Sequence, residues 1–361
     1  IPPRRPERLN PDDWEPVGQT VRPVRVLYPE EVSVEANLDV VGVGNAIVDV
    51  LAPVGESFIV EHRLDKGRMA LIDADRAADL YAEMPEGMEM SGGSAANTMV
   101  GVAALGGRAG YIGKVADDDL GRVFRRDLTA AGVGFDVDHG THLPTARCLI
   151  QVTPDAQRTL NTYLGISAHL SPADVDADLV ASARILYCEG YLWDTEDAKA
   201  AIRHAMAAAR RAGRIVALAL SDVFCVDRHR QEWLDLLERF VDVVFGNEQE
   251  VCSLYGSPDL PRALETATSK VGLVFTTLGA RGSLVAEGHQ RLEVPAVPVD
   301  RVVDTTGAGD LYASGVLFGL SRGVSLYDAA RLGSVAAAEV IGHLGARPEG
   351  DLAGSVGDLG L

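Results

Sequence analysis

Asp310 is a candidate catalytic residue because of the types and the spacing of the residues around it. The stretch DTTGAGDLYASG, residues 304–315, places this aspartate directly after Gly307, Ala308 and Gly309, which carry almost no side chain. Apolar residues recur at helical spacing from Asp310 onward, so a helix is expected to begin here. Uncovered N–H groups at a helix N-terminus attract an anion, because they lack partners and the helix dipole adds positive charge. A carboxylate in such a site could deprotonate a hydroxyl that attacks the anion, which is the layout of phosphoryl transfer.

The bland interpretation of the same stretch is an ordinary loop in which Asp310 is the N-cap of a helix. Glycine-rich turns before helices are common, so composition alone leaves both interpretations open.

Asn247 and Glu250 form a second candidate pair. In FGNEQEV, residues 245–251, Asn247 closes an apolar strand and Glu250 lies one helical turn later. Both could point at one spot, where a carboxylate could hold a water or Mg²⁺ beside a triphosphate. A capping box explains the same spacing, so this alternative also stays open.

Other glycine-rich stretches match known motifs less well. GVGNAI (42–47) has Ile47 where a dinucleotide fingerprint needs its third small residue, and no P-loop sequence occurs, so a kinase here would not be of the P-loop type. GGSAA (92–96) is similar to a nucleophile elbow, with Ser94 as nucleophile and Asp310 or a histidine as helper. It ends in alanine instead of glycine, and the start of a closely packed helix explains it as well, so a hydrolase remains an alternative.

Composition excludes several classes of protein. The 361 residues, 47% of them hydrophobic, suffice for a large core, and the formal charge of −19 argues against nucleic acid as the main partner. Four widely spaced cysteines without a C-x-x-C pattern are expected to be reduced thiols in a cytoplasmic protein. Neither a signal-peptide core nor an apolar run of about eighteen residues is present, so no membrane span is expected.

The elements that must position these residues alternate between strands and helices. This alternation predicts an α/β fold with a doubly wound, mostly parallel sheet flanked by helices, whose ligand lies beyond the carboxyl ends of the strands. The expected strands are 38–45, 108–115, 183–190, 214–220, 241–247 and 271–279. The expected helices are 94–106, 120–132, 196–213, 248–256, 308–321 and 325–343.

Two segments, 56–72 and 146–165, break this alternation. Both are expected to form strands with hairpin-like turns that pair into a small second sheet, which would act as a lid over the site. Residues 1–36, rich in Pro, Arg and acidic residues, are expected to be a mostly extended or disordered extension. Residues 348–361 are expected to form a C-terminal tail outside the folded body of residues 37–347.

Together these pieces resemble the ribokinase-like (PfkB-type) carbohydrate and nucleoside kinases. DTTGAGDLYASGVL resembles the C-terminal signature of that family, and SGGSAANT (91–98) its N-terminal signature. GNEQE resembles the family's N-x-x-E motif, and TTLGARGSLV (276–285) the strand–turn–strand that lines its ATP site. The resemblance runs from about Leu38 to about Arg347 and implies a small-molecule kinase that uses ATP and Mg²⁺.

The resemblance also implies a role for each matching residue at the phosphate end of the site. Asp310 would be the base, and the N–H groups of Gly307, Ala308 and Gly309 would bind the transferring phosphoryl group. Asp304 sits where family members can bind a monovalent cation such as K⁺. The residues implied to order Mg²⁺ through water or to line the nucleotide site are Asn247, Glu250, Thr277, Gly279 and Gly282.

At the acceptor end, the resemblance implies that Asn45, Asp49, Gly93 and Asn97 bind the substrate, with Asp49 on sugar hydroxyls. Arg158 would approach the phosphates from the lid.

Within the family, RTLNTYLGIS (158–167) and CEGYLWD (188–194) resemble the bacterial adenosine kinase-like branch. The expected reaction is therefore phosphorylation of the 5′-hydroxyl of adenosine by a monomer or homodimer. A kinase of a ribose-like sugar or of another nucleoside is the first alternative. A non-catalytic nucleotide-binding sensor is the second, although it would not need Asp310 as a base.

Overall fold

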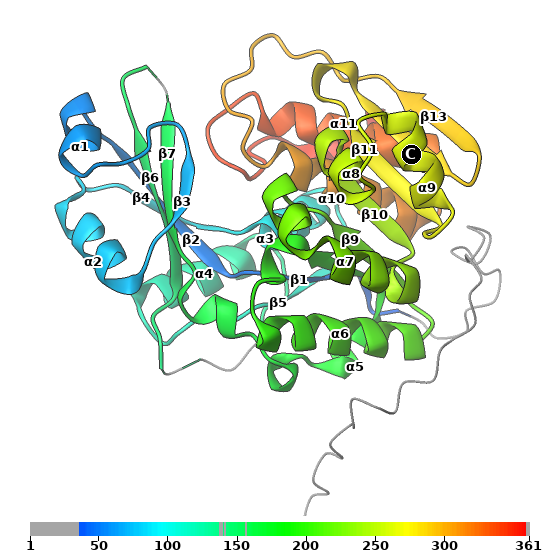
Figure 1. The fold of residues 1–361 in the computed structure, drawn as a ribbon, viewed down its shortest axis with the longest axis horizontal. Helices are drawn as coiled ribbons and strands as arrows, with labels where there is room; N and C mark the ends of the chain where they lie inside the picture. Colours follow the sequence, from blue (N-terminus) through cyan, green and yellow to red (C-terminus); the bar gives the residue numbers. More distant parts are fainter. Residues whose placement is uncertain (1–35, 137–139, 141, 156, 359–361) are drawn as a thin grey trace, which may run out of the picture.

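The chain folds around two sheets of different size, as the ribbon of this computed structural model shows (Figure 1). The structure describes residues 36–136, 140, 142–155 and 157–358. The predicted extension, apart from Ala36, lies outside the described residues.

The large sheet has eight strands in the order β13-β12-β11-β10-β9-β8-β1-β5. Every pair from β5 to β11 is parallel, whereas β12 and β13 continue the sheet antiparallel. This confirms the predicted mostly parallel sheet. The strands are β1 (Leu38–Val43), β5 (Ala109–Ile112), β8 (Ala183–Glu189), β9 (Ile215–Ala219), β10 (Val243–Asn247), β11 (Leu273–Thr277), β12 (Ser283–Glu287) and β13 (Gln290–Val294).

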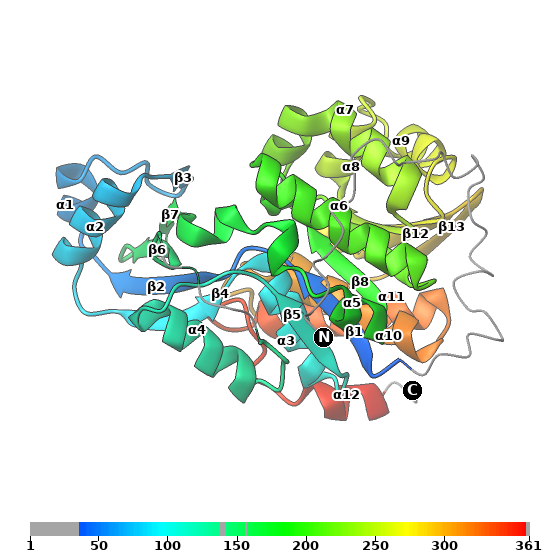
Figure 2. The same ribbon diagram turned by 90° about the horizontal axis from the view of Figure 1, so that it is seen from below.

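Helices cover both faces of the large sheet (Figure 2). Alternate residues of one strand enter different cores, since Val40 joins one buried cluster and Val41 the other. One face carries α3 (Ser94–Ala104), α10 (Ala308–Arg322) and α11 (Leu326–Val340). The other carries α5 (Ala177–Ser182), α6 (Glu196–Arg211), α7 (Val223–Phe240), α8 (Glu248–Leu254) and α9 (Leu260–Thr268).

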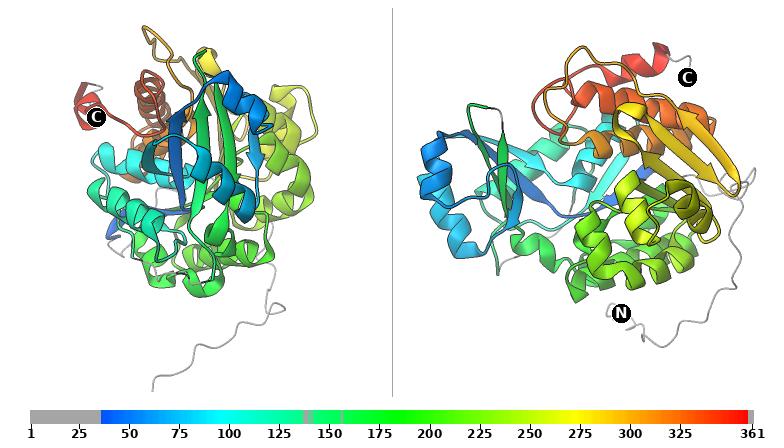
Figure 3. Two further views of the ribbon diagram at one scale, coloured as in Figure 1. Left: turned by 90° about the vertical axis from the view of Figure 1, so that its left-hand side faces the viewer. Right: turned by 45° about the horizontal axis from the view of Figure 1, so that its top comes forward.

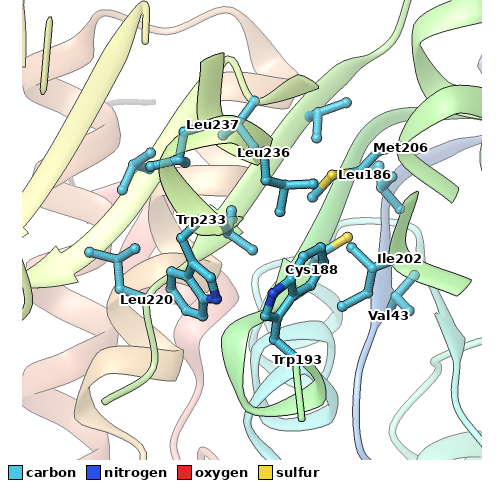
Figure 4. Close-up of a cluster of buried hydrophobic side chains, with 14 of the residues drawn as sticks. Val43, Leu186, Cys188, Trp193, Ile202, Met206, Leu220, Trp233, Leu236 and Leu237 are labelled. Carbon is cyan, nitrogen blue, oxygen red and sulfur yellow. The ribbon is translucent and has the colours of Figure 1, made fainter. Parts of the chain in front are cut away.

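The core on the α6 and α7 side contains two buried tryptophans, Trp193 and Trp233, packed beside Cys188 and Leu220 (Figure 4). On the other side, α10 packs closely on α3 and α11. The predicted C-terminal tail contains a further helix, α12 (Leu352–Asp358), in which Leu352 joins a cluster of α10 and α11 side chains. These contacts hold the first turns of α3 and α10 at the carboxyl edge of the sheet.

The second, smaller sheet lies beside the large sheet with its covering helices (Figures 1 and 3). Its strand order is β3-β7-β6-β2-β4, and we call these five strands the lid sheet. The strands are β2 (Ile47–Pro53), β3 (Met69–Leu71), β4 (Met88–Gly92), β6 (Ala146–Val152) and β7 (Arg158–Tyr163). The helices beside it are α1 (Glu56–Glu61), α2 (Ala74–Glu83) and α4 (Asp119–Ala130).

The predicted segment 146–165 forms the β6–β7 hairpin, but the prediction for 56–72 was wrong in its main element. Its first part is helix α1, and only β3 is a strand. The helical spacing shows in Phe58 and His62, which are one helical turn apart and place their ring centroids 4.0 Å from each other. The lid sheet is instead completed by β2 and β4, which sequence reasoning did not identify as lid strands.

Candidate active site

Asp310 lies in the first turn of α10, as the sequence predicts. Gly307 precedes the helix as its N-cap, with φ of +80°, a conformation that favours glycine. A Cβ on Gly307 would lie 2.7 Å from Cα of Ala346, so no larger residue fits this turn. A Cβ on Gly309 would meet no atom within 4 Å, which leaves open space above the first turn of the helix. The backbone of Ala308 already donates to Thr305 at 3.2 Å.

Two side chains of α3 hold the Asp310 carboxylate. Ser94 Oγ donates to Oδ1 at 2.7 Å, and Asn97 Nδ2 donates to Oδ2 at 3.2 Å. Burial raises the pKa of Asp310 to about 6, and these two hydrogen bonds limit the rise. Asp310 is therefore mostly ionised at neutral pH and still a usable proton acceptor, the condition that a general base must meet.

Asp49 lies inside strand β2, at the base of the lid sheet, where it pairs in register with Met90 and Cys148. A Cβ on Gly92 would collide with its carboxylate, so the glycine makes room for it. Burial raises the pKa of Asp49 to about 7, although Arg347 and Arg158 favour its ionised form. The structure thus gives a half-buried carboxylate that faces the same space as Asp310.

A cavity of about 460 Å³ joins these residues to the ends of β10 and β11. Lid and body both line it, since Ile150 and Leu160 come from the lid sheet and Phe245 and Phe275 from the large sheet. The predicted site residues that line this cavity are Asp49, Gly93, Asn97, Asn247, Glu250, Thr277, Gly307, Gly309 and Asp310. A second hollow of about 540 Å³, beside α2 on the lid, contains none of the predicted residues.

Glu250 and Asn247 form a capping box that also faces the cavity. Asn247 Oδ1 accepts from the Glu250 backbone at 2.9 Å, and Glu250 accepts from Nδ2 of Asn247 at 2.6 Å. Burial raises the pKa of Glu250 to about 7. The capping-box interpretation is confirmed, and the cap fixes the Glu250 carboxylate at the cavity wall. Thr277 lies beside Asn247 in the β10–β11 register.

Gly279 and Gly282 shape the turn that follows β11 and do not belong to the cavity lining. Both have positive φ, +61° and +92°, and a Cβ on Gly282 would collide with the Val294 carbonyl. The backbone conformation at these two positions explains why both are glycines.

Asn45 does not line the cavity either, because its polar atoms are used inside the protein. Its backbone and Nδ2 donate to Glu189 Oε1 at 2.7 and 2.9 Å, and its Oδ1 accepts from Ser167. Glu189 Oε2 accepts from the Ala95 backbone at 2.7 Å, and burial raises its pKa to about 7. Asn45 and Glu189 thus fix the start of α3, and with it the residues that hold Asp310.

Arg158 and Asp304 meet at the seam between lid and body. Arg158 Nη1 lies 2.8 Å from Asp304 Oδ2, which also accepts from the Gly345 backbone at 3.0 Å. Oδ1 of Asp304 accepts from the backbone and hydroxyl of Thr306 at 3.1 and 2.8 Å. The Asp304 carboxylate therefore already accepts three hydrogen bonds from the protein and forms one ion pair.

Sequence reasoning missed Arg347, Glu189 and the aromatic side chains of the cavity. Arg347 is largely buried, and its Nε donates to Asn97 Oδ1 at 3.3 Å. It lies in GARPEG, which has no motif spacing. Phe245 and Phe275 were read only as strand residues, yet their stacked rings, with centroids 5.4 Å apart, form part of the cavity wall.

The assembled site has the parts for a transfer to a hydroxyl group. It combines a carboxylate that could act as a base, an open helix N-terminus that could bind an anion and a second carboxylate that could accept hydrogen bonds from hydroxyl groups. Among the residues that the structure describes, no group of three or more His, Cys, Asp or Glu side chains could hold a metal ion. No helix in this part of the chain is long and apolar enough to cross a membrane.

Comparisons with known proteins agree on one family. A family model described as "pfkB family carbohydrate kinase" matches residues 68–351. The structure of an adenosine kinase from Sinorhizobium meliloti is 49% identical with a TM-score of 0.84, covering 90% of this chain and 100% of that chain. A "probable sugar kinase protein" from Rhizobium etli CFN 42 is 45% identical with a TM-score of 0.84, covering 90% and 99%. The fructokinase of Klebsiella pneumoniae is 29% identical over 289 residues, 76% of this chain and 92% of the fructokinase.

Proposed function

The chain belongs to the pfkB family of carbohydrate kinases, and on that premise we propose that it transfers the γ-phosphate of ATP to a primary hydroxyl of a small acceptor. The observation that carries the proposal is the position of Asp310, which Ser94 and Asn97 hold beside the open helix N-terminus of α10. A base and an anion site within one helical turn support in-line transfer of a phosphoryl group.

In this mechanism Asp310 accepts the proton of the acceptor hydroxyl as that oxygen attacks. The first turn of α10, from Gly307 to Gly309, stabilises the charge that develops on the transferring group. Ser94 and Asn97 keep the carboxylate aimed at the hydroxyl, and the lid sheet excludes water.

The residues at the other end of the cavity fit a nucleotide with Mg²⁺. Asn247, Glu250 and Thr277 supply the hard oxygen atoms that Mg²⁺ and its waters prefer. Glu250 would act through water, because both of its carboxylate oxygens accept hydrogen bonds from Asn247. When bound, Mg²⁺ would neutralise charge on the phosphates.

A monovalent cation at Asp304 is a less direct fit. Its carboxylate already accepts hydrogen bonds from Thr306 and Gly345 and pairs with Arg158, so a cation there would have to displace Arg158 or bind backbone carbonyls beside it.

Adenosine is the acceptor that we propose, through its 5′-hydroxyl. The similarity to the Sinorhizobium adenosine kinase supports it, as do Ile150 and Leu160, which offer an apolar surface to a flat base near Asp49. A sugar acceptor is the second candidate, favoured by the similarity to a fructokinase and to a probable sugar kinase.

A panel of nucleosides and sugars in an ADP-release assay tests the proposal. We expect adenosine to give the highest kcat/KM. If ribose or fructose turned over far better than every nucleoside, adenosine would be excluded and the kinase chemistry retained. If no acceptor released ADP above the background rate, the non-catalytic sensor would replace the kinase.

A further inference from the structure

Arg347 places a largely buried guanidinium group near Asp310, and it lies in a part of the chain that no motif covers. It lies in the segment between α11 and α12 and donates Nε to Asn97 Oδ1 at 3.3 Å. Its Nη2 is buried and has no hydrogen-bond partner among the residues that the structure describes. A charged group is costly to hold in such a place, so its position calls for a role.

The chemistry of the two side chains fixes the direction of this contact. An arginine can only donate, whereas the amide of Asn97 has a donor end and an acceptor end. Arg347 therefore requires the carbonyl oxygen of Asn97 on its own side, which leaves Nδ2 to donate to Asp310 at 3.2 Å. In the flipped amide, Oδ1 would face the Asp310 carboxylate, and two acceptors would repel each other.

We propose that Arg347 is a positioning residue for the catalytic base, acting through Asn97, whose amide it orients so that Nδ2 donates to Asp310. The inference rests on the proposed function, since it needs Asp310 to be the base. The same segment contacts the anion site, because Gly345 donates to Asp304 and Ala346 packs against Gly307. The C-terminal segment thus supports both halves of the reaction centre.

Other titratable groups near Asp310 must be taken into account in the test. Asp49 on β2, Glu189 at the end of β8 and Tyr187 within β8 lie within electrostatic range of it. Arg347 itself lies within electrostatic range of Asp127 of α4, Asp49 of β2 and Tyr111 of β5. Removing Arg347 therefore changes the field at Asp49 as well as the orientation of Asn97, and the experiment must separate these effects.

A double-mutant cycle makes this separation. Arg347→Met, Asn97→Ala and the double variant are compared with wild type by the pH dependence of kcat/KM, with the acceptor that turns over best. Each single variant weakens a hydrogen bond that favours ionised Asp310. The acid limb, where kcat/KM falls as Asp310 takes up a proton, should therefore move to higher pH. The value of kcat should fall about 10-fold. In the Asn97→Ala background, Arg347→Met should have no further effect on either quantity.

Independent effects of the two substitutions would overturn the inference, because a purely electrostatic action on Asp49 persists without Asn97. A rise in acceptor KM with an unmoved acid limb would also overturn it, since Arg347 would then contact the acceptor. Arg210→Met is the matched control: it breaks a partly buried ion pair with Asp242 and should leave the acid limb in place.

Thermal unfolding of each variant shows whether it folds. If Arg347→Met does not fold, Arg347→Gln takes its place, because a glutamine amide presents either end and does not orient Asn97. Asp310→Asn in the same series separates the two proposals. If Asp310→Asn retains turnover, both the base and the role of Arg347 are rejected, whereas its inactivity together with an additive cycle rejects Arg347 alone.

Discussion

Arg158 and Asp304 join the lid sheet to the body by an ion pair, with Nη1 and Oδ2 2.8 Å apart and both side chains largely buried. Arg158 begins β7, whereas Asp304 lies in the loop that leads to Gly307 and the helix N-terminus. Nη1 of Arg158 also lies 3.5 Å from the Thr306 hydroxyl. The position of the lid is thereby tied to the backbone that would bind the transferring phosphoryl group.

Replacing Arg158 by methionine should loosen the lid. Loss of a partly buried ion pair destabilises by about 1–3 kcal/mol, so local opening of β6 and β7 should become about 5- to 150-fold more frequent. Hydrogen exchange of the hairpin measures this, with and without saturating acceptor. Lys66→Met is the control, because it breaks exposed lid contacts with Glu56 and Asp155 and none with the body. Equal exchange in wild type and Arg158→Met would show that the ion pair does not hold the lid.

Asp310→Asn should fold and bind both ligands but lose most turnover. The amide keeps the size of the side chain but cannot take a proton, and general base catalysis contributes about 10²- to 10⁴-fold to rate. Steady-state kcat and separate titrations with acceptor and ATP check this. A kcat within a few-fold of wild type would exclude Asp310 as the base.

The site should make the ligand-free protein less stable as pH rises. Burial raises the pKa of Asp310 to about 6 from 3.8, and those of Asp49 and Glu250 to about 7 from 3.8 and 4.5. Between about pH 4 and 7 the folded chain thus holds protons that the unfolded chain has lost, so the free energy of unfolding falls as pH rises through this window.

Thermal unfolding between pH 5 and 8 measures this fall, and Asp310→Asn should reduce it. Asp155→Asn is the control, because the pKa of exposed Asp155 is lowered to about 2 and its titration lies below this window. A wild-type Tm that rises across the window, or a slope that Asp310→Asn leaves unchanged, would contradict the prediction.

The parts of the site that the sequence predicts are those where local backbone geometry demands a residue type. Gly307 needs positive φ, and Asn247 and Glu250 cap one helix three residues apart. Arg347 and Glu189 could not be predicted in this way. Their partners Asn97 and Ala95 are 250 and 94 residues distant, so only the fold brings them together.

The secondary structure of the lid sheet was likewise predictable only where its strand pairing is local. The β6–β7 hairpin is local and was predicted, whereas β2 pairs with β4 and β6 across long stretches of chain. Helix α7 was not predicted, and its backbone departs from helical geometry at His229, which interrupts the helical period. Short apolar runs such as that of α1 are ambiguous between strand and helix until tertiary contacts select one.

Asp49 should bind the hydroxyl groups of the acceptor and not the nucleotide. It lies within the strand β2 and lines the cavity, so it is not the cap of a turn. Its carboxylate can accept two hydrogen bonds from a vicinal diol, each contributing about 1.5–3 kcal/mol, so Asp49→Ala should weaken acceptor binding by about 10- to 10³-fold or more. The affinity for ATP should barely change, because the predicted nucleotide residues Asn247, Glu250 and Thr277 lie at the ends of β10 and β11 in the large sheet.

Calorimetric titration of acceptor and ATP into the folded Asp49→Ala protein separates these roles. Asp127→Ala is the matched control, because it removes a largely buried carboxylate that accepts from Ser91 and does not line the cavity. The two variants should also differ in stability. At pH 8 the loss of Asp49 removes an ionised group whose pKa burial has raised to about 7, so this variant should melt at or above the wild-type temperature. An unchanged acceptor Kd in Asp49→Ala would eliminate the diol-binding role, whereas equal losses of acceptor and ATP affinity would indicate a general distortion of the cavity.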